Sequence, residues 1–146
     1  MTTTTATTAC GAAGAAPAAG SEADRRALEA LVGRLGRWLD DGAPAAAARS
    51  LFTPDVVVRT AGGRAEGLDA VVAQAARNHR VPTQHLIANP LVALDGDRAT
   101  IDANLLVAFA RAEGTELLGE RYALEARRTG DGWRLARVAA TPVWRR

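Results

Sequence analysis

After Pro82 the chain consists of long segments in which apolar and polar residues alternate, with turn sequences between them. Alternation with a period of two predicts β-strands that bury one face. Asp95-Gly96 and Gly130-Asp131-Gly132 are typical of tight hairpin turns. Long strands joined by such turns predict an antiparallel meander, and this constrains the fold more than any other feature. The predicted strands are residues 83–94, 98–111, 116–128 and 132–144.

The residues before Pro82 begin with a helical pattern. Ser21 and Asp24, three positions apart, resemble a capping box. Apolar residues then recur at three- and four-residue spacing from Leu28 to Leu39, which indicates one buried helix face. We expect this helix to end near Asp40-Asp41-Gly42.

Two more helices and one strand are predicted before the meander. Pro44 suits the first turn of a short helix that residues 45–52 complete. Residues 55–60 contain three consecutive valines and predict a strand that ends at the Gly62-Gly63 turn. Apolar residues at helical spacing over 68–76 predict a third helix. Helices followed by a meander favour an α+β fold, a cone-shaped curved antiparallel sheet wrapped around about three helices.

The chain of 146 residues is long enough for one domain with a hydrophobic core. Residues 1–20 are rich in Thr, Ala and Gly and lack the apolar side chains that would offset the entropy of ordering. We therefore predict a disordered low-complexity tail, followed by a single domain over residues 21–146. The tail fits neither a secretory signal nor a transit peptide, and no apolar run approaches a membrane span. We expect a cytoplasmic protein that does not contact membranes.

The composition argues against several classes of function. All 18 basic residues are Arg, so this chain cannot form a Schiff base through lysine. The arginines are scattered among 16 acidic residues, whereas a nucleic-acid site needs a concentrated basic stripe. Cys10 is the only cysteine, so an intrachain disulfide is impossible. No metal-ligand spacing and no glycine-rich phosphate loop occurs, and we expect neither a metal nor a cofactor.

His85 is the main candidate for chemistry. It lies at the start of a predicted strand, in the stretch Thr83-Gln84-His85. Imidazole exchanges a proton near neutral pH, and a carboxylate behind the ring would fix its tautomer. The alternative is that His85 only hydrogen-bonds a neighbouring strand. The other histidine, His79, ends the third helix, where a basic group suits the helix dipole, and we expect it at the surface.

Several short stretches together resemble the nuclear-transport-factor-2-like superfamily, and within it the SnoaL-like proteins. Their order and spacing carry the resemblance from about position 27 to the end of the chain. The resemblance implies the cone fold, but the fold hosts many activities, among them cyclases, dehydratases, a dehydrochlorinase, epoxide hydrolases, an isomerase and binding modules. The matching stretches are Trp38–Gly42, Leu51–Val56, Glu66-Gly67, Thr83–His85, Leu94–Ala99, Asp131–Trp133 and Val143-Trp144.

Scytalone dehydratase and the dehydrochlorinase are the most informative members. Both have a catalytic histidine in a Thr-x-His stretch at the position of His85, paired with an aspartate that falls on Asp40 or Asp41. The dehydratase's second histidine falls near Phe109 and its asparagine near Tyr122, so scytalone is not the expected substrate. The ketosteroid isomerase base would fall near Arg59 or Thr60, so that mechanism is not expected either.

The leading hypothesis is a small cofactor-independent lyase, isomerase or cyclase that acts on an apolar, polyketide-like or cyclic molecule. His85 would be the general base, oriented by Asp41 or Asp40, although helix-end aspartates are often only caps. A non-catalytic ligand-binding or dimerisation module is the second hypothesis. An epoxide hydrolase that uses Glu66 with the helix-end acids is the third. The resemblance also implies a homodimer formed through the sheet. The residues expected to contact the substrate are Trp38, Asn104, Phe109, Tyr122 and Trp144.

Overall fold

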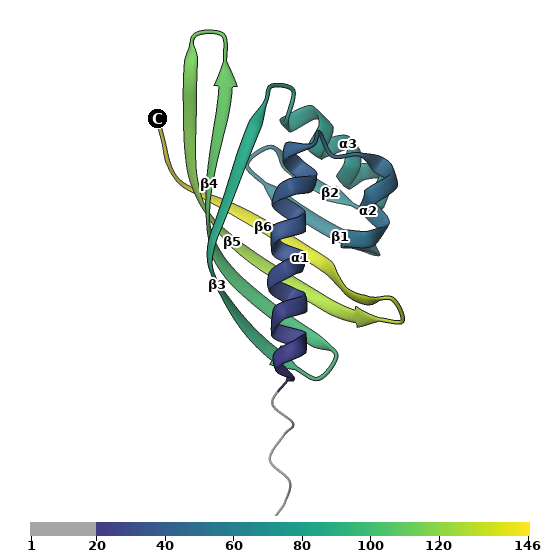
Figure 1. The fold of residues 1–146 in the computed structure, drawn as a ribbon. Helices are drawn as coiled ribbons and strands as arrows, with labels where there is room; N and C mark the ends of the chain where they lie inside the picture. The colour runs from purple at the N-terminus through teal and green to yellow at the C-terminus, as the bar shows by residue number, and fades with distance from the viewer. Residues whose placement is uncertain (1–19) are drawn as a thin grey trace, which may run out of the picture.

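The computed structural model describes residues 20–146, which form three helices and one six-stranded mixed sheet (Figure 1). The strand order is β2-β1-β6-β5-β4-β3, and the sheet is not closed. Neighbouring strands are antiparallel except β1 and β6, which are parallel. In chain order the elements are α1 (Glu22–Asp40), α2 (Ala45–Leu51), β1 (Phe52–Thr60), β2 (Gly63–Glu66), α3 (Leu68–Asn78), β3 (Thr83–Asp95), β4 (Arg98–Arg111), β5 (Gly114–Thr129) and β6 (Gly132–Arg145).

Helix α1 begins at the predicted capping box. The Ser21 side chain accepts the backbone N–H of Asp24, and the Asp24 carboxylate accepts the backbone N–H of Ser21 in return. The same carboxylate accepts the indole N–H of Trp133 at 3.0 Å and pairs with Arg128 at 2.8 Å. One acidic residue therefore caps α1 and joins it to β5 and β6. The helix lies across one face of the sheet with its apolar side inward (Figure 1).

The sheet curves around the helices because its long strands are irregular at defined points. Asn89 has φ +55, and the pairing of β3 with β4 shifts register between Ala88 and Leu91. Asparagine tolerates this left-handed conformation better than most residues, so a bulge forms there. The pairing of β5 with β6 shifts between Gly119 and Glu120 and again between Glu125 and Ala126. These bends produce the concave face on which the core and the cavity lie.

The predicted α+β cone is confirmed, with differences at the element ends. Strand β1 begins at Phe52, earlier than the predicted 55, because this residue pairs with Leu135 of β6. Strand β2 was not predicted. It consists of only four residues after the Gly62-Gly63 turn, and Gly63, with φ +119, opens it. Such a short hairpin partner lacks the alternating apolar pattern by which strands are recognised.

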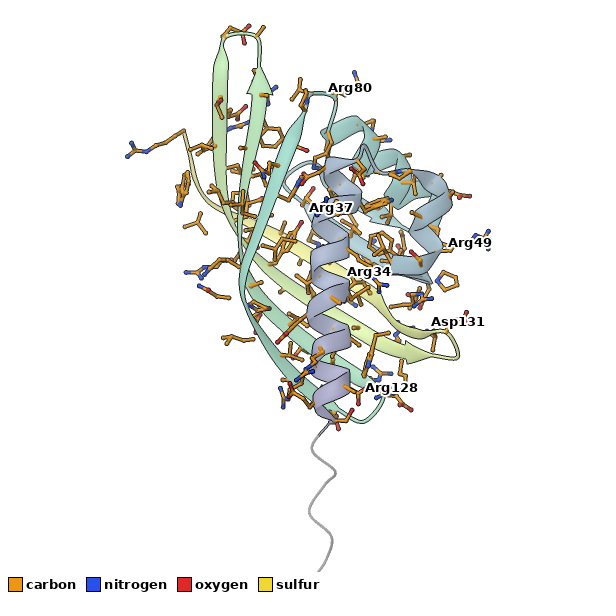
Figure 2. All side chains as sticks on the ribbon, in the orientation of Figure 1. Arg34, Arg37, Arg49, Arg80, Arg128 and Asp131 are labelled. Atoms are coloured by element: carbon orange, nitrogen blue, oxygen red, sulfur yellow. The ribbon has the colours of Figure 1, made fainter. Side chains whose placement is uncertain are left out.

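Exposed arginines are spread over separate elements. Figure 2 shows Arg34 and Arg37 on α1, Arg49 on α2 and Arg128 near the end of β5. In the described part of the chain, no helix is both long and apolar enough to cross a bilayer. The cytoplasmic location stays a prediction. Of the predicted tail, only Gly20 is among the described residues. The rest of the tail, including Cys10, lies outside them.

Candidate active site

A cavity of about 250 Å³ lies between the concave face of the sheet and helices α1 and α3. Its walls are mainly apolar side chains from α1, α3 and the central strands. Trp38 is held in this wall by an edge-to-face contact with Phe52 and by an indole N–H that donates to the Pro44 carbonyl at 3.0 Å. The cavity is therefore suited to an apolar ligand. Its apolar lining includes Leu35, Trp38, Phe52, Val71, Leu105 and Val107.

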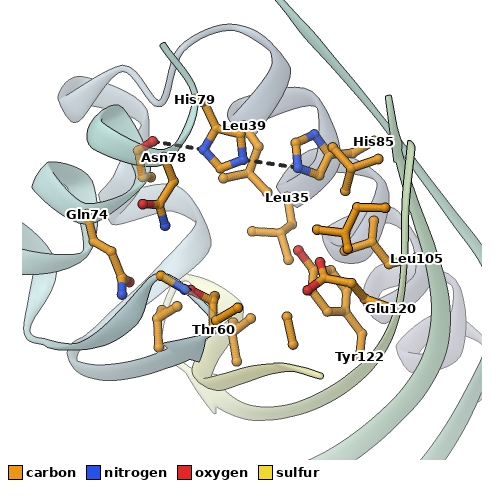
Figure 3. Close-up of a pocket in the computed structure, with 18 of the residues that line it drawn as sticks. Leu35, Leu39, Thr60, Gln74, Asn78, His79, His85, Leu105, Glu120 and Tyr122 are labelled. Atoms are coloured by element: carbon orange, nitrogen blue, oxygen red, sulfur yellow. Dashed lines mark hydrogen bonds between the residues drawn. The ribbon is translucent and has the colours of Figure 1, made fainter. Parts of the chain in front are cut away.

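His85 and Asp40 form the central polar contact of the site. The Nδ1 of His85 lies 2.6 Å from Oδ1 of Asp40, and the His85 backbone N–H donates to the same carboxylate at 3.0 Å. The Thr83 hydroxyl donates to it as well, at 3.3 Å. The His85 side chain is only 2% exposed, whereas that of Asp40 is 24% exposed. The ring is thus fixed through Nδ1, while the opposite edge, with Nε2, borders the cavity (Figure 3).

The geometry distinguishes the two aspartates that the sequence left as alternatives. Asp40 is the last residue of α1, and its side chain reaches the start of β3. Asp41 is the C-cap: its backbone N–H donates to the Arg37 carbonyl, and the residue is exposed. The predicted pairing with His85 therefore involves Asp40, and Asp41 lies outside the site.

His79 lies in the cavity wall, not at the surface as expected. Its Nε2 is 3.2 Å from the Nε2 of His85, and its Nδ1 is 2.8 Å from the Ala75 carbonyl oxygen (Figure 3). The residue follows α3 as its C-cap, so the helix end turns the ring inward. The predicted position of His79 at the helix end is correct, but a sequence pattern does not show that this end faces the start of β3.

Burial lowers the pKa of His85, and the neighbouring His79 lowers it further, whereas the hydrogen bond to Asp40 opposes both effects. Removing the ring from water disfavours its charged form. A pKa below the ordinary 6.5 favours the neutral form of the His85 ring. Its Nδ1–H then donates to Asp40, which leaves the lone pair on Nε2.

Glu120 is a cavity residue that the sequence analysis missed. It is 9% exposed and lines the cavity, and its carboxyl forms no hydrogen bond with another residue of the described chain. Burial raises the pKa of this carboxyl. Glu120 could have been found from the alternation on β5. Leu118, Glu120 and Tyr122 share one face of this strand, and Tyr122 was expected to face inward. Figure 3 shows Glu120 and Tyr122 together on the cavity wall.

The structure separates the predicted substrate-contact residues into two groups. Trp38, Phe109 and Tyr122 line the cavity, and burial raises the pKa of the Tyr122 phenol. Asn104 and Trp144 do not line it, so their placement at the pocket is corrected. Asn104 is on the opposite face of β4 and hydrogen-bonds Arg121, whereas Trp144 is 46% exposed beside Gly119. Alternation left the inward face of β4 undecided, and the inward residues are the apolar ones.

The acids assigned to the third hypothesis do not meet in the cavity. Glu66 is exposed and pairs with Arg64 at 3.1 Å, at the edge of the sheet. Of the remaining polar lining residues, Arg111 and Arg145 both bond to Glu116. Within residues 20–146, no group of three histidine, cysteine or acidic side chains is placed to hold a metal ion.

Comparison with known proteins places this chain in a family. The family model described as a SnoaL-like domain matches residues 21–139. The chain belongs to the SnoaL-like domain family. The match covers every element that contributes to the cavity except the end of β6. Among the curated proteins, none matches this chain.

Solved structures give the same assignment of the fold. A protein from Kribbella flavida is 27% identical, with a TM-score of 0.79 over 86% of this chain and 94% of its own. A scytalone dehydratase-like protein from Novosphingobium aromaticivorans is 18% identical, with a TM-score of 0.75 over 85% and 87%. A hexachlorocyclohexane dehydrochlorinase is also 18% identical, with a TM-score of 0.76 over 85% and 88%. The fold of this chain is therefore shared with proteins of these names.

Proposed function

We propose that this SnoaL-like protein is a cofactor-independent lyase, isomerase or cyclase that removes a proton from an apolar cyclic or polyketide-like molecule. One observation carries the proposal: the His85 ring is fixed by Asp40 at 2.6 Å and borders an apolar cavity. Two structural neighbours are named as a dehydratase and a dehydrochlorinase, and eliminating water or HCl includes the removal of a proton from the substrate.

His85 would act as the general base through Nε2. The substrate C–H bond breaks, its electron pair stays on the substrate, and the proton is transferred to Nε2. Asp40 holds the Nδ1–H tautomer and stabilises the imidazolium that forms. A base of this kind contributes about 10²–10⁴ in rate. The apolar walls increase the effect of each charge because they exclude water.

Glu120 would supply the second polar contact to the substrate. It is the buried acid of the cavity wall, on β5, whereas His85 is on β3. Burial favours the protonated form of this carboxyl, and in that form it can donate a hydrogen bond to a carbonyl or a leaving group. Because no other residue of the described chain forms a hydrogen bond with this carboxyl, it can form one with a ligand.

A general proton-transfer assay tests the proposal without knowledge of the natural substrate. Purified protein is incubated in D₂O with a panel of apolar cyclic ketones, for example 1-tetralone, and deuterium incorporation is followed by mass spectrometry. We expect exchange by the wild type above the buffer rate, and loss of that exchange in His85→Ala with the circular dichroism spectrum preserved. Asp41→Asn is the matched control and keeps the wild-type rate. Near-normal exchange in His85→Ala would contradict the proposal.

A non-catalytic binding module remains the second candidate because the Nε2 of His85 is in contact with His79. This candidate predicts that apolar ligands bind but that no ketone in the panel exchanges. Two features expected of such a module, a histidine without a carboxylate partner and a filled cone, are not found in the described residues.

We also propose that the protein dimerises through the outer face of the sheet. Large apolar side chains are exposed there, with Leu86 at 49% and Trp144 at 46%. Together with Leu106 and Val143 they line one shallow depression across β3, β4 and β6. A second copy of the same face would bury these side chains.

A further inference from the structure

The contact between His79 and His85 has an unusual arrangement of hydrogen-bonding atoms. The two Nε2 atoms face each other at 3.2 Å, and the ring centroids lie 5.0 Å apart at an angle of 49°. Figure 3 shows the two rings edge to edge at the cavity wall, one from the end of α3 and the other from β3. The distance is that of a hydrogen bond, so one of the two nitrogens must carry a hydrogen.

The other two nitrogens determine where the hydrogens are. The Nδ1 of His79 lies 2.8 Å from the Ala75 carbonyl oxygen, which can only accept, so this Nδ1 carries a hydrogen. The Nδ1 of His85 lies 2.6 Å from Asp40, whose carboxylate also accepts the His85 backbone N–H. An acceptor with several donors around it favours the ionised carboxylate, so this Nδ1 also carries a hydrogen.

These two Nδ1–H groups determine the protonation state of the histidine pair. A neutral imidazole has one N–H, and both rings use theirs at Nδ1. Two neutral rings would therefore place two lone pairs against each other at 3.2 Å. One additional proton between the Nε2 atoms converts this repulsion into a charge-assisted N–H···N hydrogen bond. Its positive charge balances the negative charge of Asp40, which suits a His85 side chain that is 2% exposed.

We propose that His79 and His85 share one proton in the unliganded protein, and that His79 is a positioning residue that controls access to the Nε2 of His85. When the shared proton leaves to solvent water, the N–H bond breaks and its electron pair stays on the nitrogen. The two Nε2 lone pairs then repel and the contact opens. The His85 Nε2 then faces the cavity as a free base. The catalytic meaning of this step rests on the proposed function, whereas the shared proton does not.

The surrounding charges define how strongly the proton is held. Burial lowers the pKa of His85, and Asp40 opposes this effect. A positive charge on His79 also lowers the pKa of His85. With a single shared proton, however, the pair carries only one charge, and a neutral His79 that accepts the N–H favours the protonated form of His85. Removing it should lower the pKa of His85 by about one unit or more, the effect of one hydrogen bond to a charged group. The other titratable or charged groups that line the cavity or contact the pair are Asp40, Arg111, Glu120, Tyr122 and Arg145.

The experiment is an imidazole ¹⁵N NMR titration, which is simple because the chain has only two histidines. In the wild type we expect both Nδ1 atoms to be protonated, and one Nε2 proton to be shared and lost in a single step. In His79→Phe we expect the His85 titration to move to lower pH by about one unit. His79→Gln, whose amide oxygen accepts a hydrogen bond, should restore part of the shift and serves if the phenylalanine variant does not fold.

Two results would overturn the proposal. One is a His85 titration that is the same in the wild type and in both variants. The other is a wild type in which each ring takes up its proton independently. A separate measurement distinguishes this proposal from the proposed function: the pH profile of ketone deuteration in His79→Phe should move by the same interval as the NMR titration. If no ketone is deuterated by any variant, the proposed function fails, and the NMR result still decides the shared proton.

Discussion

Asp40 and His85 are joined twice, because the Asp40 carboxylate accepts the ring Nδ1–H at 2.6 Å and the backbone N–H at 3.0 Å. The side-chain bond fixes the tautomer and the angle of the ring. The backbone bond fixes the end of α1 against the start of β3, so both partners are held by regular elements. A site placed on such elements keeps its geometry better than one placed on loops.

Replacing Asp40 with Asn should lower the pKa of His85 further. The amide keeps a similar shape and an oxygen acceptor, but the negative charge that favours imidazolium is lost. Burial already lowers the pKa of His85, and without the Asp40 charge less remains to oppose that effect. Histidine NMR titration measures the change, and Asp41→Asn, one residue away and exposed, is the matched control. An unchanged His85 titration in Asp40→Asn would show that the carboxylate does not act on the ring.

The long regular elements were predicted well because their patterns are local. The four strands after Pro82 were predicted within two residues of their observed ends, and α1 was predicted from its capping box and apolar face. The start of β1 could not be predicted, because it depends on pairing with Leu135, which is distant in the sequence. Strand β2 could not be predicted, because four residues are too few to show an alternating pattern.

The site was only partly predictable for the same reason. His85 and a helix-end aspartate were identified, but the choice of Asp40 depends on the angle at which α1 meets β3. His79 was expected at the surface, and its contact with His85 depends on how α3 approaches β3. Asn104 was expected in the pocket because alternation shows which residues share a face, but not which face is concave.

Charge on the outer sheet face should prevent dimerisation. We expect the wild type to sediment as a dimer and Leu86→Glu as a monomer, because a carboxylate would be buried without a partner. Leu86 is 49% exposed in the single chain, so the substitution should leave the fold unchanged. Ala30→Glu, on the exposed side of α1, introduces the same charge away from the interface and should remain dimeric. A wild type that is monomeric across a wide concentration range would contradict this prediction.

Asp24 should stabilise the fold at neutral pH and lose this effect in acid. Its hydrogen bonds with Arg128, Trp133 and Ser21 hold its pKa well below the ordinary 3.8. A depressed pKa contributes stability above the unfolded value, and the contribution falls as the pH drops below about 3.8. Asp24→Asn should therefore have a lower free energy of unfolding than the wild type at pH 7, with the difference decreasing below pH 4.

Urea denaturation at several pH values measures that difference. Asp97→Asn is the matched control, because Asp97 pairs with the same Arg128 at 3.0 Å but its side chain is 80% exposed. It should change stability much less than Asp24→Asn. Equal effects of the two substitutions would show that capping and the Trp133 contact add nothing to the ion pair.

Glu120 should have the opposite effect on stability. Burial raises its pKa above the ordinary 4.5, so the folded state holds the proton more tightly than the unfolded state does. Above the raised pKa, folding keeps a carboxylate in a desolvated position. The free energy of unfolding therefore carries a penalty at neutral pH. This penalty decreases as the pH falls through the folded pKa and is absent below about 4.5.

Glu120→Gln should consequently be more stable than the wild type at pH 7 and equally stable at pH 4, because glutamine has a similar shape without the charge. The same urea titrations measure this. Glu125→Gln is the control, since Glu125 is exposed on the same strand and pairs with Arg137 at 3.2 Å. If Glu120→Gln lowers stability at pH 7, Glu120 has a partner that its carboxylate requires. A stabilised Glu120→Gln that has lost ketone deuteration would mean that the protein keeps an unfavourable buried acid for its ligand.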